Sequence, residues 1–134
     1  MTDRRDVSGM WYGSFAGPGV APNRFIAMLD ESGGRISGTT SEPDELGEVD
    51  LIHAYLSGTR EGAAVWFVKQ YDGAAHSAHA VDYSGTIDAE GGEISGAWRF
   101  ATYAGQFVMR RERFDEELLA EERGIALDAG VQAR

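Results

Sequence analysis

Lys69 is the residue with the most distinctive chemical setting, because it is the only lysine in the chain. It stands in a run of β-branched and aromatic residues that predicts a strand over 63–71. If it shares an inward face with Phe67 and Tyr71, its amine lies in apolar surroundings, which lower the pKa of an amine. Such an amine could contact an acidic ligand or form a Schiff base. At the rim of the fold it would instead extend into solvent.

Aromatic and histidine side chains form the second group of candidate binding residues. His53 and Tyr55 lie on one face of a predicted strand, and other predicted strands contribute further rings. Converging rings with a few polar tips are typical of a small-molecule cavity. They also fill the core of a small barrel that holds no ligand. The predicted ligand-binding set is His53, Tyr55, Trp66, Lys69, Tyr71 and Trp98.

Other chemistries have little support in the sequence. There is no Cys, which excludes thiol catalysis and cysteine metal sites. His76 and His79 are three positions apart in a predicted loop with no obvious third ligand, so no metal site is predicted. There is no phosphate-binding loop, dinucleotide-binding glycine pattern or nucleophile elbow, so no cofactor and no catalytic residue is assigned.

Length and charge limit the classes of partner. A chain of 134 residues with 43% apolar residues predicts one globular domain. The net charge of −10 argues against nucleic acid and against an anionic membrane surface. The first residues resemble no secretory signal, and no apolar run is long enough for a membrane helix, so a cytoplasmic location is predicted.

A repeated glycine motif organises the elements that must position these side chains. The stretch Asp30–Gly38, DESGGRISG, returns 58 residues later as Asp88–Gly96, DAEGGEISG. Each copy predicts a hairpin turn, because glycine supplies the positive φ that tight turns require. Two related four-stranded halves, roughly residues 7–58 and 63–112, follow from this repeat, with both turns at the same end.

The alternation of apolar residues predicts eight strands, over 7–15, 24–30, 35–41, 49–58, 63–71, 81–88, 93–100 and 105–111. The nearly continuous apolar run in 24–30 predicts that both faces of this strand are covered. Eight short antiparallel strands predict an all-β fold, an eight-stranded antiparallel up-and-down β-barrel without open edges. We expect a flexible N-terminus over 1–6, the barrel over 7–112, a C-terminal α-helix over 113–125 and a flexible tail over 126–134.

The predicted helix carries Phe114, Leu118 and Ile125 on one stripe. It would pack on the outside wall of the barrel or contact a partner subunit, so a homo-oligomer is a possible assembly.

Two motifs give the chain a resemblance to a known group of barrels. Gly9-Met10-Trp11 resembles the Gly-x-Trp motif of the lipocalin, fatty-acid-binding and avidin barrels, the calycins. In that group a basic residue near the end of the last strand packs over the Trp. The resemblance therefore implies that Arg111, with Arg110 as the neighbouring candidate, forms a barrel-closing pair with Trp11. Gly-Gly-x-Ile-Ser-Gly followed by Trp98 is also similar to uncharacterised bacterial barrels, for which no activity is implied.

Three interpretations of function follow. The first is a non-enzymatic module that binds a small hydrophobic or amphipathic, possibly acidic, molecule inside the barrel. The second is a ligand-free structural barrel that associates with itself. The third and least favoured is an isomerase or cyclase using His53 or Lys69, because no base with an orienting partner can be identified.

Overall fold

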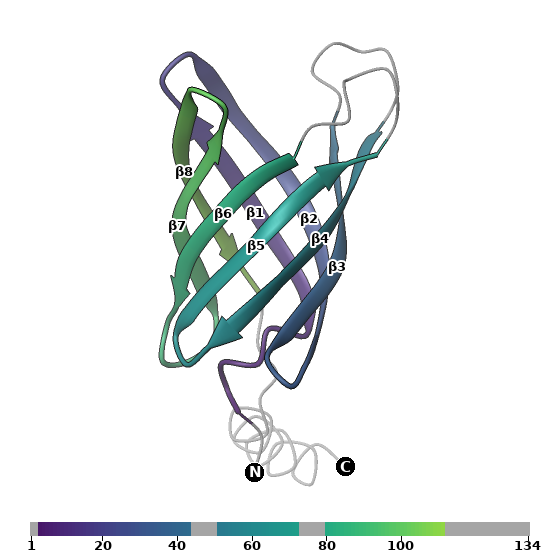
Figure 1. Ribbon diagram of the computed structural model, residues 1–134, viewed down its shortest axis with the longest axis vertical. Coiled ribbons are helices and arrows are strands. Elements are labelled where there is room, and N and C mark those ends of the chain that lie inside the picture. Colours follow the sequence, from purple (N-terminus) through teal and green to yellow (C-terminus); the bar gives the residue numbers. More distant parts are fainter. Residues whose placement is uncertain (1–2, 44–50, 73–79, 112–134) are drawn as a thin grey trace, which may run out of the picture.

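A computed structural model describes residues 3–43, 51–72 and 80–111 of the chain. These residues form a closed barrel in which each strand pairs antiparallel with the next and the last strand pairs with the first (Figure 1). The strands are β1 (Gly9–Gly17), β2 (Val20–Ser32), β3 (Arg35–Pro43), β4 (Leu51–Glu61), β5 (Ala64–Tyr71), β6 (Ala80–Ile87), β7 (Glu93–Phe100) and β8 (Tyr103–Arg110).

The predicted all-β barrel of eight antiparallel strands is confirmed. The predicted helix over 113–125 and its apolar stripe lie outside the described residues. In the described part of the chain, no helix is long and apolar enough to cross a membrane.

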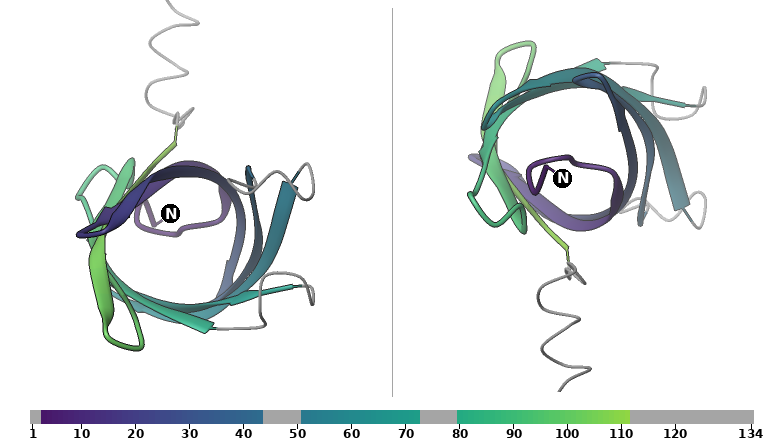
Figure 2. Two further views of the ribbon diagram at one scale, coloured as in Figure 1. Left: turned by 90° about the horizontal axis from the view of Figure 1, so that it is seen from above. Right: turned by 90° about the horizontal axis from the view of Figure 1, so that it is seen from below.

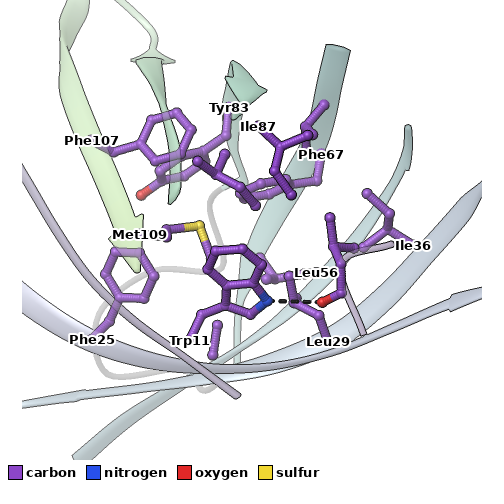
Figure 3. Packing of buried hydrophobic residues seen from close by; sticks show 14 of the residues in the cluster. Trp11, Phe25, Leu29, Ile36, Leu56, Phe67, Tyr83, Ile87, Phe107 and Met109 are labelled. Carbon is purple, nitrogen blue, oxygen red and sulfur yellow. Dashed lines mark hydrogen bonds between the residues drawn. The ribbon is translucent and has the colours of Figure 1, made fainter. Parts of the chain in front are cut away.

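The barrel interior is lined by the apolar half of each alternating strand. Trp11 is fully buried, and its indole Nε1 donates a hydrogen bond to the carbonyl of Val7 at 2.8 Å (Figure 3). Farther along the interior, the ring of Tyr83 stacks on Phe67 at 5.0 Å and meets Phe107 edge-on at 4.9 Å between ring centroids. Edge-to-face and offset contacts of this kind add to the free energy of burying the rings.

The two glycine turns lie at the same end of the barrel, as the repeat predicts (Figure 1). Gly33, Gly34 and Gly91 have φ values of 58°, 81° and 74°, which is the region that disfavours side chains. Residues 3–8 lie across the lumen at this end when the barrel is viewed along its axis (Figure 2). We call it the plugged end, and the opposite end, with the β1–β2 and β7–β8 turns, the loop end.

Strand β2 differs from its prediction in two ways. It begins at Val20 rather than at 24, because Pro22 lies where pairing with β1 shifts register, a position that tolerates a missing N–H. The prediction that both of its faces are covered is wrong, since Ile26 and Met28 are exposed on the outside of the barrel.

Candidate functional site

Lys69 lies inside the barrel on β5, with 1% of its surface exposed. It shares the inward face with Phe67 and Tyr71, which is the first of the two positions that the sequence left open for it. The carboxylate of Glu42, from β3, lies beside it and is 3% exposed. Lys69 Nζ and Glu42 Oε1 are 2.7 Å apart, and they form an ion pair removed from water.

Two further side chains complete the surroundings of the Glu42 carboxylate. The hydroxyl of Tyr71 donates to Oε1 at 2.8 Å, and Asn23 Nδ2 on β2 donates to Oε2 at 2.7 Å. Both carboxylate oxygens are therefore satisfied by three neighbouring groups, which is the condition under which a buried charge is tolerated. We call Asn23, Glu42, Lys69 and Tyr71 the buried polar cluster.

The ammonium of Lys69 is surrounded differently from the carboxylate that it contacts. Its Nζ lies 4.8 Å from the ring centroids of Phe15, Phe25 and Tyr71, within the range of a cation–π contact. Among the described residues, the acceptor that contacts it is Glu42 Oε1, at 2.7 Å. An ammonium carries three N–H donors. Glu42 Oε1 can accept from only one of them, so the other N–H donors have no acceptor among the described residues.

A buried hydroxyl group, that of Thr40, also has hydrogen-bonding capacity that the described residues do not use. Thr40 Oγ1 on β3 is buried and lacks a hydrogen-bond partner in the described structure. Thr40 and Tyr71 are both paired with Ala54 on β4, one from each side. The small side chain of Ala54 thus separates two interior polar positions that flank it.

Burial changes the proton affinity of the cluster. Loss of solvent lowers the pKa of Lys69, and the nearby Glu42 carboxylate only partly opposes this shift. Burial raises the pKa of Tyr71 and of Tyr83, and the Glu42 charge adds to both shifts. Tyr71 therefore stays protonated and keeps donating to Glu42 throughout the ordinary pH range.

Glycine residues allow two of the aromatic rings to lie close to the wall. A Cβ at Gly13 would lie 2.3 Å from the Phe25 ring, and a Cβ at Gly105 would lie 2.6 Å from the Trp98 indole. Both distances are shorter than any ordinary contact. These glycines are needed because the rings of Phe25 and Trp98 lie directly over the strands β1 and β8.

Three of the six predicted ligand-binding residues lie inside the barrel, namely Lys69, Tyr71 and Trp98. Trp98 Nε1 donates to the carbonyl of Ala16 at 3.1 Å, and its ring meets Phe15 edge-on at 6.2 Å. Phe15 in turn contacts the Lys69 ammonium. Trp98 therefore belongs to the same region through Phe15.

The other three predicted residues, His53, Tyr55 and Trp66, all face outward, so the structure does not bring them together with the interior residues. His53 is exposed and its Nδ1 lies 3.2 Å from the Ser41 hydroxyl, while Tyr55 and Trp66 are more than half exposed. On β4 the inward positions belong to the smaller Ala54 and Leu56. The assumption that large rings face the interior therefore fails on β4, where the ring of Tyr55 is on the solvent side.

Sequence reasoning missed Glu42 and Asn23. Glu42 continues the alternation of Ile36 and Thr40 on β3, and this spacing could have revealed its inward position. Asn23 directly follows Pro22 in a stretch interpreted as a loop, so no strand pattern pointed to it. In the ranges 3–43, 51–72 and 80–111, no group of three His, Asp or Glu side chains is placed to hold a metal ion.

Trp11 and Arg111 are in contact at the plugged end, away from this cluster. The guanidinium carbon of Arg111 lies 4.4 Å from the Trp11 ring centroid. Its N–H groups also donate to the carbonyls of Asp6, Ser8 and Gly91 at 2.6, 2.7 and 2.8 Å. Arg111 thereby fastens the N-terminal segment and the β6–β7 turn over the indole. A stacked guanidinium of this kind contributes about 0.5–2 kcal/mol.

Comparison with solved structures gives two similar folds, both designed proteins. A redesigned beta barrel superposes with a TM-score of 0.69 at 9% identity, covering 83% of this chain and 96% of that one. A de novo designed fluorescence-activating beta barrel superposes with a TM-score of 0.60 at 14% identity, covering 84% and 100%. No protein-family model matches the chain, and neither does any curated protein. These likenesses show the eight-stranded barrel fold.

Proposed function

We propose that the barrel binds a small hydrophobic or amphipathic molecule in the loop-end half of its interior, without catalysing a reaction. The observation that carries this proposal is the Lys69 ammonium, which is buried among aromatic rings and whose three N–H donors face a single acceptor, Glu42, in the described structure. Leaving a buried donor unfilled costs about 1–3 kcal/mol. A ligand that supplies an acceptor would recover this free energy, and only the bound state would gain it.

The charge balance of the cluster favours an uncharged acceptor. Glu42 already neutralises Lys69, so the pair presents no net positive charge to an incoming group. A carboxylate ligand would have to compete with Glu42 and would meet its negative charge, whereas an amide or ketone oxygen needs only a free N–H. We therefore narrow the ligand from the possibly acidic molecule of the sequence interpretation to one with a neutral carbonyl. Its apolar part would contact rings such as Phe15 and Phe25.

The structural neighbours are compatible with this role. One of them is described as a fluorescence-activating barrel, and an eight-stranded barrel is wide enough to hold one small ligand. The resemblance of Gly9-Met10-Trp11 to the calycin motif supports an interior ligand in the same way. Both arguments concern the architecture, while the polar cluster supplies the chemistry.

A titration with matched probes tests the proposal. Decanamide and decanoate have the same apolar chain and differ in charge, so calorimetric titration of each separates a neutral acceptor from an acidic one. We expect decanamide to bind more tightly. The double variant Lys69→Met/Glu42→Gln removes the interior ion pair without leaving an unpaired charge. It should weaken decanamide binding about tenfold or more, as expected for a hydrogen bond to a charged donor.

The chain offers a matched control for this variant. Arg110 and Glu93 form an outward ion pair of 2.8 Å on β7 and β8, and Arg110→Met/Glu93→Gln should leave decanamide binding unchanged. If the Lys69→Met/Glu42→Gln variant bound decanamide as tightly as the wild-type chain does, the buried polar cluster would have no role in ligand recognition. If neither probe binds, and native mass spectrometry of the purified protein shows no retained small molecule, the binding function itself is wrong.

A further inference from the structure

The outer wall of β1 and β2 carries a compact group of large apolar side chains. Met10 lies directly opposite Met28 in the strand register, and Tyr12 lies directly opposite Ile26. All four point away from the interior and are between 43% and 55% exposed. We call these four residues the β1–β2 outer face.

This grouping differs from the rest of the described outer wall. Trp66 is also exposed, but its register partners are Thr59 on β4 and Ser84 on β6. Single exposed apolar residues such as this one are normal on soluble proteins, whereas a contiguous group marks an interaction surface. The β1–β2 outer face is therefore a candidate contact surface that the interior ligand site does not use.

The charges on β2 indicate which partner fits. Its outward residues in order are Arg24, Ile26, Met28 and Asp30, so the apolar pair has a cation on one side and an anion on the other at equal spacing. A two-fold axis that lies in the interface, perpendicular to β2 and level with Ala27, exchanges the two ends of this series. It would bring Arg24 of each copy against Asp30 of the other, and Ile26 of each against Met28 of the other.

We propose that the β1–β2 outer face binds a second copy of this chain, forming a two-fold symmetric dimer. In such an interface the same surface must complement itself, and the series from cation to anion on β2 does so. The chain as a whole carries a net charge of −10, which opposes contact between copies. The outward series Arg24–Asp30 is neutral, so this is a wall at which two copies can approach without that repulsion.

The two-fold geometry makes a strong prediction about charge reversal. Arg24→Asp places two acidic residues against each other at both ends of the interface, and Asp30→Arg does the same with two basic residues. Each single variant should therefore weaken the dimer about tenfold or more, because like charges facing each other at an interface are strongly unfavourable. A mixture of the two single variants restores an opposite-charge contact at both ends. The doubly reversed Arg24→Asp/Asp30→Arg chain does so within its own dimer.

Sedimentation equilibrium over a range of protein concentrations measures these effects. The barrel wall is convex, so the buried area falls at the low end of specific interfaces and concentrations up to about 1 mM are needed. We expect the wild-type mass to rise from 14.5 kDa toward twice that value. Both single variants should stay closer to monomer, and their mixture and the doubly reversed chain should return to the wild-type curve.

Two controls separate this dimer from general charge effects. Arg99→Asp and Asp82→Arg make the same charge changes on the exposed surface of β7 and β6, where the two residues are register partners, and should leave association unaffected. Met28→Glu should abolish association. A wild-type chain that is monomeric at about 1 mM would overturn the proposal. The proposal would also be overturned if the mixture of the single variants associated no better than each variant alone. The same holds if the two control variants weakened the dimer as much as Arg24→Asp and Asp30→Arg do.

Discussion

Both ends of the barrel hold cations, partly buried at the plugged end and fully buried toward the loop end, and the cations are satisfied in different ways. At the plugged end, Arg111 donates to several backbone carbonyls, and Arg60 donates to Glu31, Asp3 and the carbonyl of Gly62. Toward the loop end, Lys69 has one carboxylate and aromatic rings around it, so its three N–H donors face a single acceptor within the described chain. At the plugged end the arginine donors hold chain segments together, whereas toward the loop end some N–H donors of Lys69 are available to a ligand.

The choice of cation fits this division. A guanidinium has five N–H donors in a rigid plane, so Arg111 and Arg60 can each bind several fixed acceptors at once and hold chain segments together. An ammonium on a flexible stem is a compact charge whose donors can turn toward a new acceptor. The difference suggests that stability resides mainly in the plugged half, while recognition resides near Lys69.

The largest effect on stability should come from the centre of the plugged half. Trp11→Ala removes a fully buried indole, its hydrogen bond to Val7 and the surface on which Arg111 stacks. We expect a loss of about 3–5 kcal/mol in the free energy of unfolding, measured by urea denaturation. The matched control is Trp66→Ala on the outer wall, where the indole is 54% exposed and the loss should stay below about 1 kcal/mol. Similar losses in both variants would contradict this division of stability.

The next effect concerns the buried ion pair, and it is strongly non-additive. Lys69→Met leaves Glu42 without its counter-charge, and Glu42→Gln leaves Lys69 without its only described anionic partner. Each change should cost about 3 kcal/mol, because an uncompensated charge stays buried. The double variant should return to within about 1 kcal/mol of wild type, since apolar or neutral replacements fit a buried pair site well. Additive losses in a double-mutant cycle would show that the two residues are not coupled.

Much of the fold was predictable from the sequence because its signals are local. The repeated glycine turns and the alternation on each strand define eight strands, and neighbouring strands must then pair. The same alternation put Lys69 on one face with Phe67 and Tyr71, although it left open whether the amine lay inside or at the rim. These predictions need only the chain on either side of a residue.

The partners of Lys69 could not be predicted in this way. Glu42 lies on β3 and Lys69 on β5, so the intervening strand β4 separates them in the sheet. They meet across the curved wall on a diagonal, because the register partners of Glu42 and Lys69 on β4 are Ile52 and Leu56, and the residue between these two positions is the small Ala54. Such a contact depends on register and closure, which no stretch of sequence specifies alone. Which face of β2 points inward also depends on the closed sheet. The apolar side chains of Ile26 and Met28 therefore predicted burial, although both are exposed.

A smaller effect distinguishes the two arginines at the end of β8. Arg111→Lys keeps the charge but loses the planar fork that reaches the carbonyls of Asp6, Ser8 and Gly91. We expect a loss of about 2 kcal/mol, on the scale of one lost hydrogen bond from a charged donor. Its neighbour Arg110 faces outward in an ion pair with Glu93, and Arg110→Lys should change stability by less than about 1 kcal/mol. Equal losses in urea denaturation would mean that Arg111 does not fasten the plugged end.

The pH dependence of stability should also separate the two ends, beginning with Lys69. Its pKa in the folded chain lies below the ordinary 10.5, so the unfolded chain binds more protons between these two values. Stability relative to Lys69→Met should therefore rise with pH in this window, by at most about 1.4 kcal/mol per pH unit. Urea denaturation of both proteins between about pH 8 and pH 9.5 tests this before the unfolded-state tyrosines titrate. A difference that shrinks as pH rises would show that Glu42 outweighs burial.

The smallest effect is expected at Asp3, where stability also rises with pH but in an acidic window. Its carboxylate accepts the Arg5 N–H at 3.0 Å and an Arg60 N–H at 2.6 Å, and these two contacts lower its pKa below 3.8. The stabilisation is therefore complete above pH 3.8 and is lost as the pH falls through the folded value. Because Asp3 is exposed, the effect is small and salt weakens it. Asp3→Asn should be less stable than wild type near neutral pH and equal to it in acid. A gap that widens on acidification would mean that Asp3 does not help to hold the plug over the barrel.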